Sequence, residues 1–171
     1  MTHKEAELTQ LKKAILEMMA LAKVQLEKSK IAFLQNDMDL AQEVIHNEKR
    51  MNALELSIDR DVENIFALFQ PVASDLRFVI SMMKINSDLE RIGDYADGIA
   101  DYIVDLNKPI SKKALEQTRI GEMFDIAISM MADIHVAYEN DDTLLARKVY
   151  KKDSELNQIN RTASEMISTL I

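Results

Sequence analysis

The sequence contains no cysteine and no tryptophan, and it has only 3 glycines and 2 prolines among its 171 residues. The absence of cysteine excludes disulfides and thiolate chemistry. Scarce glycine and proline leave few positions at which a helix has to end. Together with an aromatic content of 5% and 11 methionines, this composition indicates an all-α protein whose length is sufficient for a sizeable core.

Long apolar runs and a net positive charge are also lacking. No stretch approaches the roughly 18 uninterrupted apolar residues of a membrane span, and residues 1–13 lack the apolar segment of a signal peptide. We therefore expect a cytoplasmic protein without direct membrane insertion. The net charge of −8 and the pI near 4.9 argue against nucleic acid or an anionic membrane surface as a partner.

Residues 70–106 have the pattern of one long helix around which the rest of the chain is organised. Pro71 suits the first helical position, where a missing N–H costs nothing. Apolar residues then recur at intervals of four and three, which places them on one face. This apolar face consists of Phe78, Met82, Ile85, Leu89, Ile92, Ala96, Ile99, Ile103 and Leu106.

Acidic residues follow the same rhythm on the opposite side of this helix. They are Glu90, Asp94, Asp97, Asp101 and Asp105. Like charges three or four residues apart destabilise a helix by about 0.2–0.5 kcal/mol per pair, and no lysine or arginine interrupts the row. A multivalent cation would turn this repulsion into attraction, whereas the alternative is a solvated acidic face.

Two further helices are expected before this one, at about residues 4–34 and 39–69, with Asp37 or Asp39 as a cap for the second. The connections are short enough to make neighbouring helices antiparallel, so residues 1–108 should form a first three-helix bundle. The second helix carries its own polar row along a helix–helix boundary: Glu48, Asn52, Glu55, Asp59 and Glu63.

An antiparallel arrangement brings the two polar rows together. Glu48 should lie level with Asp94, and Asn52 level with Glu90. These residues, with Asp97, are the candidate ligands of a metal ion. Carboxylate oxygens favour hard ions such as magnesium, calcium, manganese or ferric iron, although zinc also accepts them. The alternative is an acidic groove with loosely held counter-ions.

Beyond Pro109 the sequence repeats itself. The pattern of Met18, Ala22, Ala32, Asp37, Leu40, Val44, Glu48, Met51 and Asn52 returns as Met123, Ala127, Ala137, Asp142, Leu145, Val149, Asp153, Leu156 and Asn157. A repeat of this kind indicates a duplicated helical unit, with helices at about residues 111–139 and 142–170. Residues 109–171 should therefore form an incomplete second bundle that lacks its third helix.

The missing helix leaves an apolar surface on the second unit. It consists of Ile120, Met123, Phe124, Ala127, Met130, Met131 and Ile134. Because a bare apolar patch of this size is an association site or a liability, we expect self-association through the C-terminal hairpin. The alternative is that the sequence is a piece of a longer chain.

Other motifs allow less specific conclusions. Glu43 and His46 have the Glu-x-x-His spacing of ferritin-like di-iron bundles, but such bundles need two copies and the sequence has one. Neither a P-loop nor a Gly-rich phosphate cradle is present, and we expect no enzyme activity. Gly93 and Gly98 indicate either tight packing inside the bundle or a docking surface.

Residues 71–100, PVASDLRFVISMMKINSDLERIGDYADGIA, closely resemble the central motif of the PhoU family. The resemblance implies tandem three-helix bundles, often dimeric, and no known catalysis. It also implies a role in coupling the phosphate ABC transporter, through its ATPase subunit, to a sensor histidine kinase, and in repressing the phosphate-starvation response. Protein partners of this kind would bring the chain to the inner face of the membrane.

Some family members bind metal clusters on surface E/D-x-x-x-D motifs. Glu90 to Asp94 is similar to that motif, Glu48 to Asn52 has asparagine in place of the final acid, and Asp153 to Asn157 is the second-repeat version. By this resemblance Asp153 is a further candidate metal ligand. Two other functions remain open: a metal-cluster or di-iron protein of the ferritin type, and a purely structural helical scaffold.

Overall fold

The structure is a computed structural model that describes residues 2–168, and this part of the chain contains helices and no strands. The helices are α1 (His3–Gln35), α2 (Met38–Phe69), α3 (Ala73–Leu106), α4 (Lys112–Thr118), α5 (Ile120–Glu139) and α6 (Thr143–Ser168). The all-α prediction is therefore confirmed. The predicted last helix runs past α6 into residues 169–170, which lie outside the described part.

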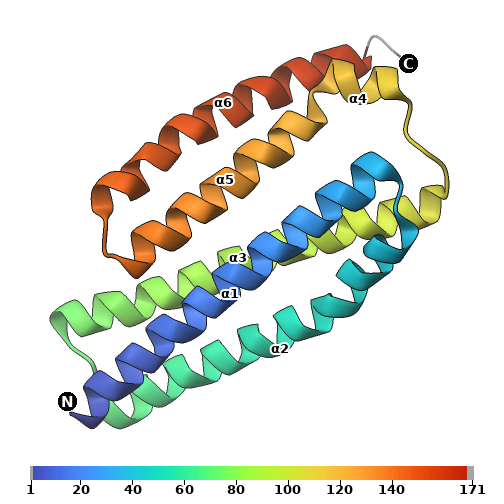
Figure 1. The fold of residues 1–171 in the computed structure, drawn as a ribbon. Helices are drawn as coiled ribbons and strands as arrows, with labels where there is room; N and C mark the ends of the chain where they lie inside the picture. Colours follow the sequence, from blue (N-terminus) through green and yellow to red (C-terminus); the bar gives the residue numbers. More distant parts are fainter. Residues whose placement is uncertain (1, 169–171) are drawn as a thin grey trace.

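The first three helices pack against one another as an antiparallel bundle (Figure 1). Every helix contributes side chains that are fully buried, because each carries an apolar face at helical spacing. The core includes Ile15, Met18, Met51, Ile58, Val79 and Met82. On α3 the predicted apolar face is buried at Met82, Leu89, Ala96 and Ile103 and half-buried at the positions between them.

Short turns with side-chain caps set the ends of these helices. Thr2 and Glu5 form a capping box at the start of α1, and the Asp37 carboxylate accepts a hydrogen bond of 3.0 Å from the Leu40 amide at the start of α2. Asn36 and Gln70 end α1 and α2 in the left-handed conformation. The connections from α1 to α2 and from α2 to α3 are so short that consecutive helices have to be antiparallel neighbours.

The predicted role of Pro71 is wrong. Val72 is the N-cap of α3 and Ala73 is its first residue, so Pro71 lies in the turn, where its side chain is buried. Gln70 and Ala73 both have positive φ, at 44° and 50°. The chain reverses between these two residues, and Ala73, at the end of the reversal, is also the first residue of the helix.

The helix predicted at residues 111–139 is also interrupted. Arg119 has a left-handed backbone with φ of 53° and separates α4 from α5. Its guanidinium makes two hydrogen bonds with the Glu122 carboxylate, which hold the bend. The break turns α4 away from the axis of α5, so that α4 also contacts α6 (Figure 1). The residue at the break is an arginine, not a glycine or proline, and therefore gave no sign of it in the sequence.

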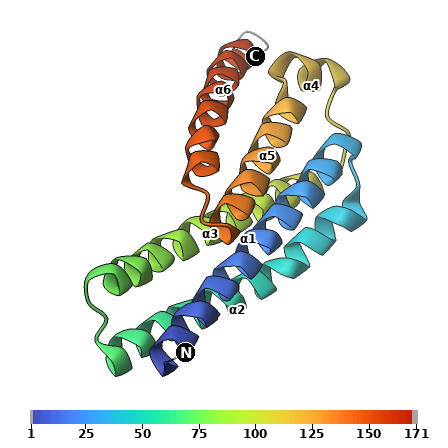
Figure 2. The ribbon, with the colours of Figure 1, turned by 60° about the vertical axis from the view of Figure 1, so that its left-hand side comes forward.

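The second unit consists of the α5–α6 hairpin and α4. α5 packs on α1, while α6 packs on α5 and α4 on the far side from α2 (Figures 1 and 2). Polar contacts accompany this joint: the Tyr138 hydroxyl donates to the Met82 sulfur at 2.8 Å, and Lys12 pairs with Asp141 at 2.9 Å. No third helix follows α6 within the described residues, so the second bundle has two long helices where the first has three.

Candidate functional site

The register between α2 and α3 is fixed by a buried amide. Asn86 of α3 is fully buried, and its Nδ2 donates to the backbone oxygen of Glu55 at 3.1 Å and to Oδ1 of Asp59 at 2.9 Å. Because a buried amide without partners is costly, this pair of bonds disfavours a slip of one helix along the other. The same register places the Glu48 carboxylate beside Gly93, the residue before Asp94.

Glu48 is the most unusual side chain of this region. It is 9% exposed, and neither of its carboxylate oxygens has a hydrogen-bond partner among the described residues. Burial raises the pKa of Glu48 to about 7, and the negative charges of Asp97, Asp94 and Glu90 act in the same direction. A buried carboxylate that faces other carboxylates is an electrostatic defect unless a proton or a cation compensates it.

The neighbouring acids show the same effect more weakly. Burial raises the pKa of Glu90 and of Asp97, and the charge of the following acid on α3 adds to each shift. Oδ1 of Asp97 is buried without a hydrogen-bond partner in the described part. Glu55 belongs to the same field, because burial and the charges of Asp59 and Asp94 raise its pKa. We call Glu48, Glu55, Glu90, Asp94 and Asp97 the acidic cluster.

The acidic cluster has the charge and the donor atoms for a hard cation, but its side chains are not arranged as a closed ligand set. Among residues 2–168, no three histidine, aspartate or glutamate side chains are grouped so that they could hold one metal ion. Asn52 and Asp94 are exposed, whereas Glu48 is buried. The structure thus brings the predicted ligands Glu48, Glu90, Asp94 and Asp97 into one electrostatic field, and metal binding stays a prediction.

Comparison with known proteins identifies the family to which the chain belongs. The model of the PhoU domain matches residues 15–103 and 120–171. The chain belongs to the PhoU family. The first matched segment lies within α1 to α3, and the second begins at the first residue of α5 and includes α6.

Individual relatives extend the match over nearly the whole chain. The "Phosphate-specific transport system accessory protein PhoU homolog" of Aquifex aeolicus is 32% identical over 165 residues, which are 96% of this chain and 74% of that protein. The "Phosphate-specific transport system accessory protein PhoU" of Escherichia coli is 31% identical over 153 residues, 90% of this chain and 63% of that protein.

Solved structures agree with the fold. The PhoU structure from Pseudomonas aeruginosa superposes with a TM-score of 0.90 at 30% identity, and it matches 97% of this chain and 79% of its own. The "phosphate transport system regulatory protein PhoU" from Streptococcus pneumoniae gives a TM-score of 0.86 at 30% identity, over 99% and 79%.

Asp153, the second-repeat candidate of this PhoU chain, lies apart from the acidic cluster. It is exposed on α6, which packs on α4 and α5 and lies on the other side of the molecule from α2 (Figure 1). One of its carboxylate oxygens accepts a hydrogen bond of 3.1 Å from Asn157. Its repeat counterpart Glu48 is buried by α3, and α6 has no such neighbour among the described helices.

The two glycines of α3 differ in their surroundings. A Cβ on Gly93 would lie 2.7 Å from Cε of Met51, so this glycine permits close packing of α2 on α3. A Cβ on Gly98 would meet no atom of the described part of the chain within 4 Å, and Gly98 is exposed. The packing interpretation therefore holds for Gly93, and the docking interpretation stays open for Gly98.

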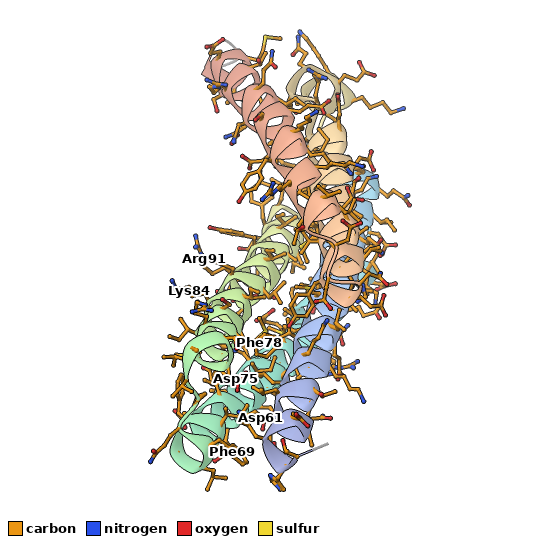
Figure 3. All side chains as sticks on the ribbon, turned by 90° about the vertical axis from the view of Figure 1, so that its left-hand side faces the viewer. Asp61, Phe69, Asp75, Phe78, Lys84 and Arg91 are labelled. Atoms are coloured by element: carbon orange, nitrogen blue, oxygen red, sulfur yellow. The ribbon has the colours of Figure 1, made fainter. Side chains whose placement is uncertain are left out.

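Other predicted candidates take part in ordinary surface contacts. Glu43 and His46 are exposed rather than inside the bundle, and Glu43 pairs with Lys28 at 2.6 Å, which removes the geometry of a ferritin-like site. Arg91 pairs with Asp88 at 3.7 Å and projects from the outer side of α3 together with Lys84 (Figure 3). Asp75 pairs with Lys4 at 2.6 Å.

Sequence reasoning placed Glu55 in the polar row of α2 but not among the ligands. Glu55 is two helical turns from Glu48, and the antiparallel register places it near Glu90. The spacing alone could therefore have added Glu55 to the candidate ligands. Asn86 had no such signal, because one asparagine inside an apolar pattern does not reveal which backbone groups it will meet.

Proposed function

We propose that this PhoU-family chain is a negative regulator of phosphate-starvation signalling. It acts by contact with the ATPase subunit of the phosphate ABC transporter and with a sensor histidine kinase, at the cytoplasmic side of the membrane, and not by catalysis. The names of the relatives, which describe accessory and regulatory proteins of phosphate transport, support this role. None of the six described helices has an apolar stretch long enough to cross a bilayer.

The exposed face of α3 is the surface we propose for these contacts. It contains Met83, Arg91, Asp94, Gly98 and Asp101, which recur at helical spacing and are all exposed. Gly98 supports this assignment because a glycine inside a helix costs roughly 1 kcal/mol relative to alanine, and no atom of residues 2–168 occupies the space it leaves. A partner helix that approaches closely at Gly98 would use it.

A large side chain in place of Gly98 tests whether partners bind at the proposed surface. Gly98→Trp should abolish pull-down of the ATPase subunit and of the kinase, while Ala53→Trp, at an exposed position of α2, should leave it unchanged. In a bacterium that lacks its own PhoU protein, the unaltered chain should restore repression of a phosphate-starvation reporter, and Gly98→Trp should fail to do so. Restored repression without any contact to either protein would refute the proposed mode of action.

We further propose that the acidic cluster binds a hard divalent or ferric cation. Glu48, Glu90, Asp94 and Asp97 would supply the carboxylate oxygens, with Asn52 and Glu55 at the edge, and Asp153 would belong to a separate, weaker site on α6. The unpartnered, buried carboxylate of Glu48 supports this idea, since a cation would compensate its charge. Bound metal would neutralise the cluster and hold α2 to α3.

Thermal melting with and without magnesium, calcium, manganese, ferric iron and zinc tests this second proposal. A specific cation stabilises the folded chain by mass action, so it should raise Tm of the unaltered protein. The Glu90→Gln, Asp94→Asn variant should melt higher than the unaltered protein without metal and should show no response to metal. If metal changes the Tm of both proteins equally, the acidic cluster is only an acidic surface with loosely held counter-ions.

A further inference from the structure

A row of exposed side chains follows the outer face of α3 along nearly its whole length. Its members recur at strictly alternating intervals of three and four residues, and every one of them is exposed. They are Arg77, Ile80, Lys84, Ser87, Arg91, Asp94, Gly98, Asp101 and Asp105. We call these residues the charged row. Residues at this spacing stay on one side of a helix, and a second helix can follow them as in a coiled coil.

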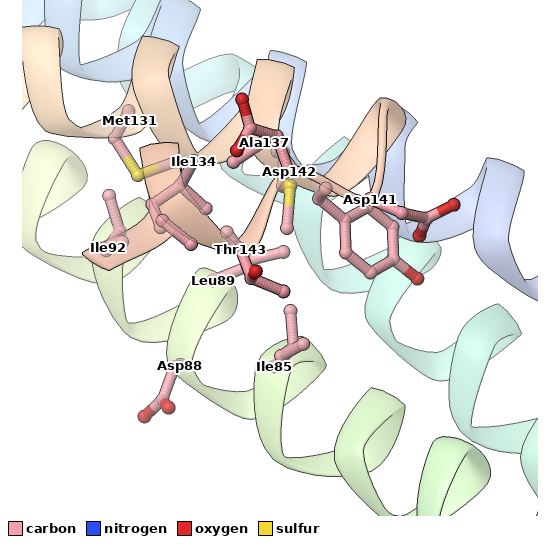
Figure 4. Close-up of a pocket in the computed structure, with 13 residues that line it drawn as sticks. Ile85, Asp88, Leu89, Ile92, Met131, Ile134, Ala137, Asp141, Asp142 and Thr143 are labelled. Carbon is pink, nitrogen blue, oxygen red and sulfur yellow. The ribbon is translucent and has the colours of Figure 1, made fainter. Parts of the chain in front are cut away.

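The charged row is separate from the two sides of α3 that pack within the chain. One side is buried against α1 and α2. A second side faces α5, where Ile85 and Ile92 line an apolar hollow together with Met131 (Figure 4). Lys84 and Arg91 of the charged row project from the outer side of the helix instead (Figure 3).

The charges of this row are sorted along the helix. Its first half carries only positive charge, and its second half carries only negative charge. The cations are Arg77, Lys84 and Arg91, and the acids are Asp94, Asp101 and Asp105. A net charge of −8 makes an uninterrupted basic half unusual on the surface of this chain.

The chain itself makes little use of these charges. Arg77 and Lys84 form no ion pair with a described residue, and the same is true of Asp101 and Asp105. Arg91 approaches Asp88 at 3.7 Å, but both side chains are more than half exposed, and such a surface pair contributes little to stability. The charges at both ends of the row are therefore available to a partner.

The order of the charges is opposite to the order that stabilises a helix. The helix macrodipole favours acids near the N-terminus and cations near the C-terminus. Asp75 in the first turn of α3 follows this rule, but it is not part of the charged row. Asp105 lies in the last turn, which contains no basic residue. The stability of α3 therefore does not explain the order, whereas recognition of a partner does.

We propose that the charged row binds one α-helix of a partner protein, and that this helix is acidic in its first half, basic in its second half and parallel to α3. Its acids then lie over the basic half of the row, and its cations lie over the acidic half. The macrodipole favours this order in the partner helix itself, and the order matches α3 only in the parallel direction. Gly98 is the position of closest approach.

The inference deepens the proposed function, because the identity of the partner, the transporter ATPase subunit or the kinase, rests on that proposal. The charge order and direction of the bound helix rest on α3 alone. The experiments below therefore use both the ATPase subunit and a synthetic helix.

Reversal of the charge order at constant net charge tests the inference. The variant Arg77→Glu, Lys84→Glu, Asp101→Lys, Asp105→Lys exchanges two charges at each end of the row, and the net charge stays at −8 because the exchanges cancel. None of these positions is a candidate metal ligand. Binding to the ATPase subunit should weaken about tenfold or more, because attraction becomes repulsion at both ends.

The matched control makes the same exchanges on α6. Arg147→Glu, Lys148→Glu, Glu155→Lys and Glu165→Lys also leave the net charge unchanged, and all four positions are exposed. This variant should bind the ATPase subunit as the unaltered chain does. Circular dichroism and thermal melting check that both variants are folded.

A single substitution separates binding from stability. Asp105→Lys should raise Tm, because it places a cation in the last turn of α3, and it should weaken binding to the ATPase subunit. A role of Asp105 in stabilising the chain requires a lower Tm instead, and that result would count against the inference.

A synthetic helix tests the direction of binding without either partner protein. A peptide with glutamates in its first half and lysines in its second half, at the spacing of the charged row, should bind the unaltered chain and lose binding as salt rises. A peptide of the same composition with alternating glutamates and lysines should bind weakly. With a maleimide at its N-terminus, the first peptide should label Ser74→Cys, near the start of α3, in preference to Asn107→Cys, after its end; the chain has no other thiol.

The two proposals fail in different ways. If the charge-order variant binds the ATPase subunit as well as the unaltered chain does, the inference is overturned and the proposed function stands. If the unaltered chain binds neither the ATPase subunit nor the kinase, the proposed function fails and the peptide decides the inference. Absence of peptide binding, or labelling of Asn107→Cys in preference to Ser74→Cys, would then overturn it.

Discussion

The two halves of the repeat have the same apolar pattern and different interiors. In α1 and α2 the residues Met18, Val44 and Met51 are fully buried. Met123 and Leu156, the counterparts of Met18 and Met51, are half-buried, whereas Val149, the counterpart of Val44, is buried at 8% exposure. An amphipathic pattern therefore specifies the face that a helix must cover, and a neighbouring helix decides whether that face becomes a core.

The largest expected difference between the halves is in cavity formation. Met18→Ala should lower the free energy of unfolding by about 3 kcal/mol, because a close-packed site cannot collapse around the lost side chain. Met123→Ala, the repeat counterpart, should cost about 1 kcal/mol, since part of that side chain already faces the open side of the second unit. Urea denaturation measures both, and equal losses would mean that the two interiors are packed alike.

The buried charge of the first half should produce a smaller, pH-dependent difference. The pKa of Glu48 rises from an ordinary value of 4.5 to about 7 in the folded chain, so the folded state binds more protons than the unfolded state between these values. Stability from this group is therefore lost as pH rises from 4.5 to 7, and above pH 7 the folded state bears the full cost of the buried charge.

Glu48→Gln should consequently stabilise the chain by roughly 2 kcal/mol at pH 8 and have little effect at pH 4. Asp153→Asn is the matched control, because Asp153 is the repeat counterpart of Glu48 and is exposed. Its effect should be small at both pH values. Urea denaturation of both variants without metal, at the two pH values, checks this, and a pH-independent effect of Glu48→Gln would show that ionisation is not the cause.

The two glycines of α3 should respond to alanine in opposite directions. Gly98→Ala adds a methyl group in open space and should stabilise the chain by about 0.5–1 kcal/mol through helix propensity. Gly93→Ala gains the same propensity but forces Met51 to move, so it should be neutral or destabilising. Thermal melting separates the two, and equal stabilisation would mean that Met51 adapts without cost.

The joint between the halves should depend least on its charges. Lys30 of α1 pairs with Asp125 of α5 at 2.5 Å, and the Asp125 side chain is 66% exposed. Lys30→Gln should therefore destabilise the chain by at most about 0.5 kcal/mol, and the loss should vanish at high salt. A loss that exceeds 1 kcal/mol and persists in salt would show that the ion pair, rather than the apolar contact of α5 with α1, holds the halves together.

Much of the fold follows from local patterns. The apolar face of α3, the Asp37 cap and the scarcity of glycine and proline predicted long antiparallel helices, and the structure has them. The break at Arg119 and the late start of α3 at Ala73 were not predictable in this way. Each depends on a positive φ at a residue that is neither glycine nor asparagine, which is stable only because the surrounding contacts fix it.

The acidic cluster shows the same division. Two charged rows at helical spacing predicted that Glu48 and the acids of α3 would share one surface, and the structure brings them into one field. That Glu48 is buried, and that Gly93 and Met51 are packed beside it, depends on the depth at which α2 and α3 meet. The spacing of residues in the sequence predicts the direction in which a side chain points from its helix axis. It does not predict the distance between the axes of two packed helices.

The sequence alone determined that this chain is helical, that its second half copies its first, and that acidic rows accompany both apolar faces of α2 and α3, because these properties are periodicities of 3.6 residues. Only the tertiary structure decided which of the repeated residues are enclosed. Met51 is enclosed because α3 packs against α1 and α2, whereas its counterpart Leu156 is half-buried because no described helix covers α5 and α6 in the same way.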